Sequence, residues 1–432
     1  MRACAIIVLL STMALSPVHA ATRLTLNDCI DKALANHPSI RSAQEDLNAG
    51  EGRVVQAAAP YLPQVQASTG YSENYALGGA FGNSSTKSYT TTVSVNQIIY
   101  DFGRTGHALD AARLGAQSAE LDLDRVVQIV VLNVKQAYYA LLQSKKLVTV
   151  AQQTLAQTES HLKQAEAFFR AGSKPRFDVT RAEVDVNNAR LGLINAQNNV
   201  RLNTIALYNA MGVDPAGDIE IEDVLSRQAA VPLVDQAQSE ALKNRPEMLK
   251  AERDIQAAQA RVKTEQSSYL PTVSANGAYN WAHGTTDMGS FNGIPLQGNV
   301  LNSWNAGVML SLPLFEGGLT KGRVGEARAN QRSLEAQRDT LRQSILLELN
   351  QAYADLDSAT ARISVMESSR KSATESLELA EGRYQAGVGP SIEVTDARVS
   401  AAKAETDYVQ ALYDYQLAAA RLFKAMGRGL ER

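Results

Sequence analysis

Cysteine and histidine are scarce in this sequence, and their scarcity argues against several kinds of site. The 432 residues include two cysteines, Cys4 and Cys29, and five histidines. The histidines show no metal-ligand spacing, and we find no phosphate-binding loop, nucleophile elbow or Cys–His pair. We therefore predict no enzyme active site, no cofactor and no metal site. Cys29 is expected to be a small buried apolar residue rather than a reactive thiol.

Long hydrophobic runs and an excess of one charge are also missing. Lys and Arg total 42 and Asp and Glu total 45, so no basic surface of the size that nucleic acid requires is expected. The apolar run over residues 3–15 follows Arg2 and precedes Val18-His19-Ala20, which predicts a secretory signal peptide over residues 1–20. An anchor helix is the alternative, but the run is too short to span a bilayer. An exported chain can still enter a membrane through β-strands.

The sequence does contain one stretch twice, at residues 169–212 and 384–427. Ala171-Gly172 matches Ala386-Gly387, and each copy ends in Ala-Met-Gly, at a constant offset of 215 positions. Each copy predicts the end of a helix, a turn, and a return helix that stops at glycine. Small and apolar residues along each return helix are spaced alternately three and four apart, which is typical of supercoiled helices.

The duplication extends over the rest of the chain. Asn36-His37-Pro38 and Tyr61-Leu62-Pro63 have counterparts 208 positions later, in Asn244-Arg245-Pro246 and Tyr269-Leu270-Pro271. The first repeat, residues 21–215, is predicted to have a helix over 24–59, strands at about 62–76 and 87–100, a very long helix over about 106–168, a tip, and a return helix over 176–210. After a connecting segment, 216–231, the second repeat, residues 232–432, is predicted to have strands at about 270–282 and 303–315 and a long helix over about 320–383. Gly/Ser-rich hairpin loops are expected at 78–85 and 283–302.

The long helices are too long for a compact domain. At 1.5 Å per residue, the helix over 106–168 would extend about 95 Å. The helix over 24–59 and the return helix over 176–210 together have about that length, so we expect them to stack end to end beside it.

Four strands per chain cannot close a barrel, and hydrocarbon does not tolerate an open sheet edge. The chain must therefore pool its strands with copies of itself. The narrow helical seams suit a ring of coiled-coil pairs around a hollow centre. These features predict an exported oligomeric conduit.

The motifs taken together resemble the TolC family of outer-membrane efflux and secretion channels. They are the duplication, the Tyr-Leu-Pro entry to each strand pair, the exit motif Leu314-Phe315-Glu316-Gly317-Gly318, the Ala-Gly tips and the Ala-Met-Gly stops, and they cover residues 22–427. The resemblance implies a mostly α fold with a β-barrel part: a homotrimer whose 12-stranded transmembrane β-barrel in the outer-membrane lipid continues into a periplasmic helical tunnel. It also implies an exit duct for tripartite efflux or type I secretion, which docks to a periplasmic adaptor and an inner-membrane pump of the RND or ABC type.

The resemblance also assigns residues to the tunnel mouth. Glu393 and Asp396 correspond to acidic rings at the aperture, which would favour cations. Asp178 and Tyr384 correspond to contacts that lock the gate, but Gly389 stands where the family has a basic partner. The adaptor contacts fall on the tip residues Ala171, Gly172, Ala386 and Gly387.

Simpler interpretations of these residues remain open. Glu393 and Asp396 can be acids that the dipole of a helix favours in its first turn, and the tip glycines can do no more than end helices. A periplasmic coiled-coil scaffold or adaptor without a membrane barrel is the alternative function. It would explain the helices but not two strand pairs at equivalent positions.

Overall fold

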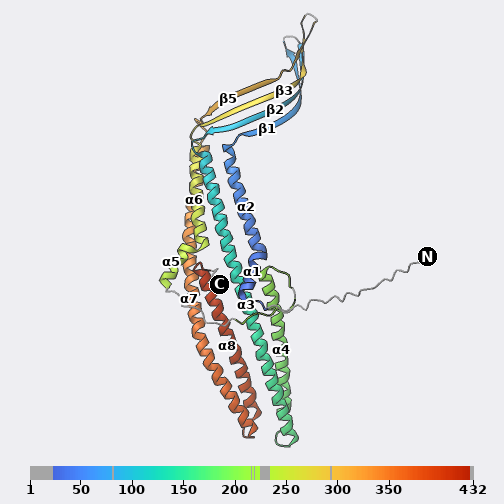
Figure 1. Cartoon of the computed structure of the whole chain (residues 1–432), viewed down its shortest axis with the longest axis vertical. Helices are drawn as coiled ribbons and strands as arrows, with labels where there is room; N and C mark the ends of the chain where they lie inside the picture. The colour runs from blue at the N-terminus through green and yellow to red at the C-terminus, as the bar shows by residue number, and fades with distance from the viewer. Residues whose placement is uncertain are drawn as a thin grey trace, which may run out of the picture.

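The computed structural model is an elongated molecule with a sheet at one end and two helical hairpins at the other (Figure 1). It describes residues 23–79, 82–215, 217, 219–223, 234–291 and 294–428. The predicted signal peptide, residues 1–20, and most of the connecting segment 216–231 lie outside the described residues. Among the described helices, none combines the length and the apolar character needed to cross a membrane.

The first repeat begins with two short helices joined at a proline. The side chain of Thr25 accepts a hydrogen bond from the backbone N–H of Asp28, and that of Asp28 accepts one in return, so a capping box starts the first helix. Pro38 starts the second, because proline is tolerated in a first helical turn but not inside a helix. The elements of this repeat are α1 (Leu26–Asn36), α2 (Pro38–Ala58), the 3₁₀ turn η1 (Ala59–Tyr61), β1 (Gln64–Gly79), β2 (Gly82–Tyr100), α3 (Arg104–Arg170) and α4 (Arg176–Met211).

The second repeat follows the same plan. Its elements are α5 (Val234–Asn244), α6 (Pro246–Ser267), β3 (Thr272–Phe291), β4 (Ile294–Asn299), β5 (Ser303–Ser311), α7 (Leu319–Gln385) and α8 (Ser391–Ala425). The two long helices, α3 and α7, have 67 residues each. Each follows a glycine in the left-handed region, Gly103 at φ 85° and Gly318 at φ 91°. Gly318 ends the predicted exit motif, and Gly103 is its repeat equivalent 215 positions earlier; a residue with a Cβ would be strained at either position.

The strands form one antiparallel sheet with two unlike faces. Its order is β1-β2-β3-β4, with β5 also paired to β3. Paired residues point to the same face; Thr69 lies opposite Thr91, Thr91 opposite Trp281, and Tyr279 opposite Trp304. That face carries most of the apolar side chains of the sheet: Val65, Tyr71, Tyr75, Val93, Val95, Val273, Tyr279, Trp281, Trp304, Val308 and Leu310. The other face is mostly Gln, Ser, Thr and Asn, because successive side chains of a strand point to opposite faces.

The predicted hairpin loops are wrong in extent. β1 and β2 continue to Gly79 and Gly82, so most of the predicted loop 78–85 is strand, and β4 together with the end of β3 occupies much of the predicted loop 283–302. Gly- and Ser-rich composition suggested a loop there. Backbone ladder hydrogen bonds and pairs such as Thr86 Oγ1 to Thr286 Oγ1, at 3.3 Å, do not require apolar side chains.

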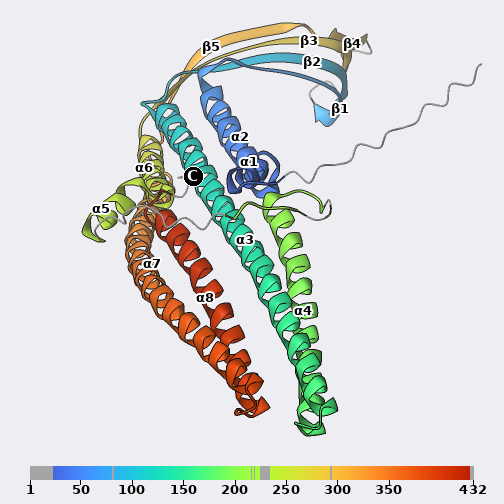
Figure 2. The same ribbon diagram turned by 60° about the horizontal axis from the view of Figure 1, so that its bottom comes forward.

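Each return helix stacks end to end on the short helix pair that opens its repeat, as predicted for the first repeat. In the first repeat, α1, α2 and α4 all pack along α3, and α4 ends at Gly212 against the α1–α2 junction. In the second, α8 ends at Gly427 against Asn244 and Arg245, at the α5–α6 junction. We call these contacts the first joint and the second joint. Figure 2 shows the resulting pair of hairpins, α3–α4 and α7–α8, running side by side away from the sheet.

The first joint contains the larger of the two main apolar cores. Its buried members include Cys29, Val134, Tyr138, Leu141, Leu207 and Met211. Cys29 is fully buried, as predicted, and burial raises the pKa of its thiol to about 11. The second joint contains a smaller, alanine-rich core around Leu349, Leu356, Leu422 and Met426.

Candidate functional site: the paired hairpin tips

The two hairpins end in turns of the same geometry, furthest from the sheet (Figure 1). In the first tip, Gly172 has φ 74°, its N–H donates to the carbonyl of Phe169, and Ser173 N–H donates to that of Phe168. In the second tip, Gly387 has φ 77° and makes the matching bond to Tyr384. Both are Schellman turns, which need glycine at the left-handed position. The local role of each tip glycine is therefore to end a long helix.

The four predicted docking residues are accessible. Ala171, Gly172, Ala386 and Gly387 are all exposed, and no Cβ added to either glycine would meet another atom within 4 Å. A partner could therefore approach the backbone of both tips closely. Their role in docking stays a prediction.

Tyr384, a predicted gate residue, is buried between the hairpins. It lies in the last turn of α7 with 1% of its surface exposed. Its ring centroid lies 5.6 Å from that of Phe168 and 5.1 Å from that of His161, both on α3. These contacts pack the end of the second hairpin against the first.

Asp178 lies near Tyr384 but makes no hydrogen bond to it. The carboxylate is buried in the first turn of α4. The Tyr384 hydroxyl is buried and has no hydrogen-bond partner among the described residues. Burial raises the pKa of Tyr384, and the negative charge of Asp178 adds to the effect. The structure thus brings the two predicted gate residues within electrostatic range of each other.

Glu393 and Asp396 are exposed near the start of α8. Glu393 Oε2 lies 3.2 Å from Nε of Arg383, in the last turn of α7. This exposed pair contributes little to stability, but it partly neutralises one of the two predicted mouth acids within its own hairpin. Asp396 lies three residues further along α8, on the same side of the helix.

Several contacts between the hairpins involve residues that the sequence analysis did not select. His161 Nε2 lies 3.3 Å from Ser391 Oγ, and Thr395 Oγ1 donates to Asp185 at 2.8 Å. Burial lowers the pKa of His161, as does the nearby cation of Arg398. These polar residues are distant in sequence and have no motif spacing, so no sequence signal would have brought them together.

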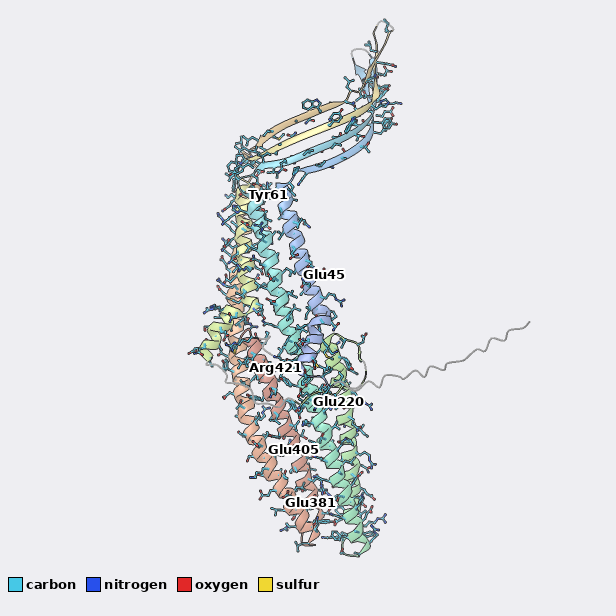
Figure 3. The ribbon with its side chains drawn as sticks, viewed as in Figure 1. Glu45, Tyr61, Glu220, Glu381, Glu405 and Arg421 are labelled. Carbon is cyan, nitrogen blue, oxygen red and sulfur yellow. The ribbon has the colours of Figure 1, made fainter. Side chains whose placement is uncertain are left out.

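Arg398 is a buried cation beside these contacts. Its side chain is 5% exposed and lies 2.7 Å from the carboxylate of Glu381. Glu381 lies in the lower part of the second hairpin (Figure 3). Its Nε and Nη1 have no partner among the described residues.

Lys174 also makes a contact between the hairpins that was not predicted, although alignment of the two repeats points to it. It is the repeat equivalent of Gly389, 215 positions earlier. Its Nζ donates to the Gly389 carbonyl at 3.3 Å and lies 5.2 Å from the ring centroid of Tyr384. A repeat-by-repeat comparison of the tips would have shown a basic residue in the first tip where the second has none.

A groove with both polar and apolar lining residues runs above the tips between α3, α4 and α8. It has a volume of about 650 Å³, and α4 contributes Asn188, Asn195, Asn199 and Asn203 to its wall. Within the described residues, no group of three or more His, Cys, Asp and Glu side chains could hold a metal ion.

Comparison with known proteins identifies the family. The model of the family described as "Outer membrane efflux protein" matches residues 29–213 and 237–428. The chain therefore belongs to the outer membrane efflux protein family, as the resemblance to the TolC family predicted. The two matched segments follow the two repeats. The chain is thus an outer-membrane efflux channel subunit and not an enzyme, and membership implies a trimer that works with pump partners.

Individual relatives agree over nearly the whole chain. Protein CyaE of Bordetella pertussis is 27% identical, over 94% of this chain and 83% of its own length. Outer membrane protein TolC of Escherichia coli is 21% identical, over 92% of this chain and 80% of its own. The structure of the open state of the Neisseria gonorrhoeae MtrE outer membrane channel superposes with a TM-score of 0.78 at 20% identity, covering 94% of this chain and 90% of that one. The fold is therefore that of a TolC-like channel subunit.

Proposed function

We propose that three copies of this chain assemble around one axis into the exit duct of a tripartite efflux or type I secretion system. The observation that carries the proposal is the sheet, which has one apolar face, one polar face and two open edges. Among the described strands, β1 pairs only with β2, and β5 pairs only with β3. Edges left open in hydrocarbon would leave backbone groups without partners. Pairing between the edges of neighbouring subunits removes that cost and turns the polar faces inward.

The helical end supports the same assembly. α4 and α7 lie at opposite edges of the helical layer (Figure 1). α4 exposes an apolar stripe in which every member is more than half exposed: Val184, Leu191, Ile194, Leu202 and Ile205. α7 exposes Leu347, Val365 and Leu379 to a similar degree. Packing α7 of one copy against α4 of the next would bury both stripes.

Mass in detergent tests this assembly. The purified mature protein is expected to have the mass of three chains by light scattering. Replacing Leu191 and Ile194 with Asp should reduce it towards one chain, because charges would then lie in the buried stripe. Replacing exposed Asp355 and Asp357 with Ala is the control and should leave a trimer. A wild-type monomer in detergent would overturn the proposal.

We further propose that the tips form the periplasmic mouth, with Glu393 and Asp396 at its aperture and the four tip residues against the adaptor. Exposure of the tips and of both acids supports this role. The Glu393→Ala/Asp396→Ala variant should weaken the block of single-channel current by a divalent cation such as Co²⁺, because carboxylates near a pore attract cations. The Asp355→Ala/Asp357→Ala variant should be blocked as the wild type is. Equal block in both variants would remove the two acids from the mouth.

The docking role of the tips has its own test. Replacing Gly172 and Gly387 with bulkier residues strains both turns, so exposed Ala171 and Ala386 are the better targets. Changing both to Glu should prevent cross-linking of the channel to a co-purifying periplasmic adaptor, while the trimer persists. Undiminished cross-linking would place the adaptor elsewhere. The RND or ABC class of the inner-membrane pump would follow from the identity of that adaptor.

A further inference from the structure

The two tips of one chain are joined by a cation that comes from the first tip. Lys174 lies in the turn between α3 and α4, whereas its two contacts, the Gly389 carbonyl at 3.3 Å and the Tyr384 ring at 5.2 Å, belong to the second hairpin. The ammonium group is therefore stabilised both by the hydrogen bond that it donates to the carbonyl oxygen and by its contact with the aromatic ring. Both acceptors are buried, so solvent screens these interactions less than on an open surface.

Gly389 has little room for a side chain of its own. A Cβ at this position would lie 3.1 Å from Cβ of Arg383 and 3.3 Å from its carbonyl carbon. With a side chain there, Arg383, which pairs with Glu393, would have to shift by a few tenths of an ångström.

We propose that Lys174 is a positioning residue that holds the first tip against the second within each chain and so keeps the mouth narrow. This inference rests on the proposed role of the tips as the mouth. It assigns the basic partner that is missing at position 389 to the equivalent position of the other repeat. Lys174 is half-buried and lies in a turn, outside the helical seams, so each hairpin can keep its fold without it.

A matched set of variants tests the charge. Lys174→Met keeps the length of the side chain and removes its charge, whereas Lys174→Arg keeps a cation that stacks on aromatic rings and donates hydrogen bonds. Lys163→Met is the control, because Lys163 is an exposed residue of α3 before the tip. In planar bilayers, Lys174→Met should spend about fivefold more time in high-conductance states, as expected for loss of a partly buried cation–π contact. Lys174→Arg and Lys163→Met should behave as the wild type.

A double variant of Lys174 and Tyr384 distinguishes a latch, meaning the specific contact of Lys174 with the second tip, from a general loss of packing at the tips. If Lys174 acts through the Tyr384 ring, Lys174→Met should increase the time in high-conductance states much less in the Tyr384→Leu variant than in the wild type. Fully additive effects would overturn the role of the ring, and a Lys174→Met channel no more open than the Lys163→Met channel would overturn the proposal.

A second readout does not depend on conductance. Cysteines introduced at exposed Ala171 and Ala386 can be joined within one chain by a short bismaleimide, while buried Cys29 stays unreactive. Lys174→Met should slow this cross-linking severalfold, and Lys163→Met should not. If Lys174→Met slows cross-linking but the protein shows no channel activity, the latch is supported and the proposed function is contradicted. If Lys174→Met leaves cross-linking unchanged, only the latch is contradicted.

Discussion

The first and second joints share one backbone plan but are stabilised by different interactions. Tyr138 and Val134 in the first joint correspond to Tyr353 and Leu349 in the second, 215 positions later. The first joint buries Tyr138 completely, and its hydroxyl donates to the carbonyl of Glu222 at 2.6 Å. Tyr353 is only half-buried. The first joint therefore depends mainly on apolar and aromatic packing.

The second joint has an ion network where the first has neutral residues. Arg245, 2% exposed, lies 2.6 Å from Glu348 and 3.1 Å from Glu247, and Lys424 lies 2.9 Å from Glu348. The repeat equivalents of these four residues are His37, Ser39, Asn133 and Asn209. One fold thus tolerates both kinds of side-chain packing, because the two joints share the same order of helices.

The charges of the second joint respond to pH. Burial disfavours the ionised forms of Glu247 and Glu348, but hydrogen bonds and attraction from Arg245, with Lys424, outweigh it, so the pKa of each carboxyl is lowered. Acids with lowered folded-state pKa values stabilise the fold above their unfolded pKa of about 4.3 and lose that contribution as pH falls. The second joint should therefore weaken in acid before the first.

The largest expected effect on stability is at the first joint, which depends on aromatic packing. Tyr138→Ala should lower the free energy of unfolding by about 3–5 kcal/mol, because it leaves a cavity in place of a fully buried ring and removes the hydrogen bond to the carbonyl of Glu222. Tyr353→Ala should cost less than half as much. The measurement is urea unfolding in detergent, followed by helical circular dichroism. Equal losses would show that the two joints are not differently built.

The ion network of the second joint is tested by Arg245→Met. This substitution should lower the free energy of unfolding by about 3 kcal/mol at pH 7, because two partly buried carboxylates lose their main partner. His37→Met, the equivalent change in the first joint, should cost about 1 kcal/mol or less. Between pH 6 and pH 3, the unfolding midpoint of Arg245→Met should fall less than that of the wild type. A steeper fall in the variant would contradict the assignment of acid sensitivity to this network.

The glycines that end the return helices should differ in the same assay. An alanine Cβ at Gly212 would lie 2.7 Å from Cα of His37, whereas one at Gly427 would lie 3.2 Å from the nearest backbone atoms. Both glycines have positive φ, 67° and 81°, so both substitutions carry a left-handed penalty of about 1 kcal/mol. Gly212→Ala should cost about 1 kcal/mol more. A larger loss for Gly427→Ala would show that the first joint is the looser one.

The smallest effect is expected at the tips, where buried His161 corresponds to exposed Ser376. The pKa of His161 is lowered by burial and by Arg398, while Asp185, Glu381 and Asp178 act in the opposite direction. A histidine held neutral when packed costs stability as pH falls below its unfolded pKa of about 6.5. His161→Gln should flatten the decline in hairpin stability between pH 7 and pH 5, measured by protection of tip amides from hydrogen exchange. Ser376→Ala should leave it unchanged.

Much of the architecture could be read from periodicity and repetition. The 3–4 spacing of small residues predicted both return helices, and α4 (Arg176–Met211) begins at the expected residue and ends one residue beyond the expected range. Along residues 89–99, Thr90, Thr92, Ser94 and Asn96 alternate with a second set of side chains, a pattern that predicts a strand with two faces. The hairpin loops were misplaced because strand pairing by backbone hydrogen bonds leaves little trace in a Gly/Ser-rich sequence.

The tips show where such inference stops. Alignment of the repeats located both turns, and the resemblance assigned Asp178 and Tyr384, but their roles at a gate stay predictions. The contacts of His161 and Lys174 depend on how the first hairpin lies against the second. No local pattern encodes that arrangement.

The sequence by itself determined a duplicated chain of strand pairs and very long helices, because period and repetition are local properties that backbone geometry converts directly into elements. The tertiary structure alone decided which side chains meet between the hairpins and which joint is ionic. The contacts between the hairpins join residues more than two hundred positions apart, such as His161 with Ser391 and Lys174 with Gly389. The energies of these contacts and of the ionic joint depend on burial, which exists only once the helices have packed.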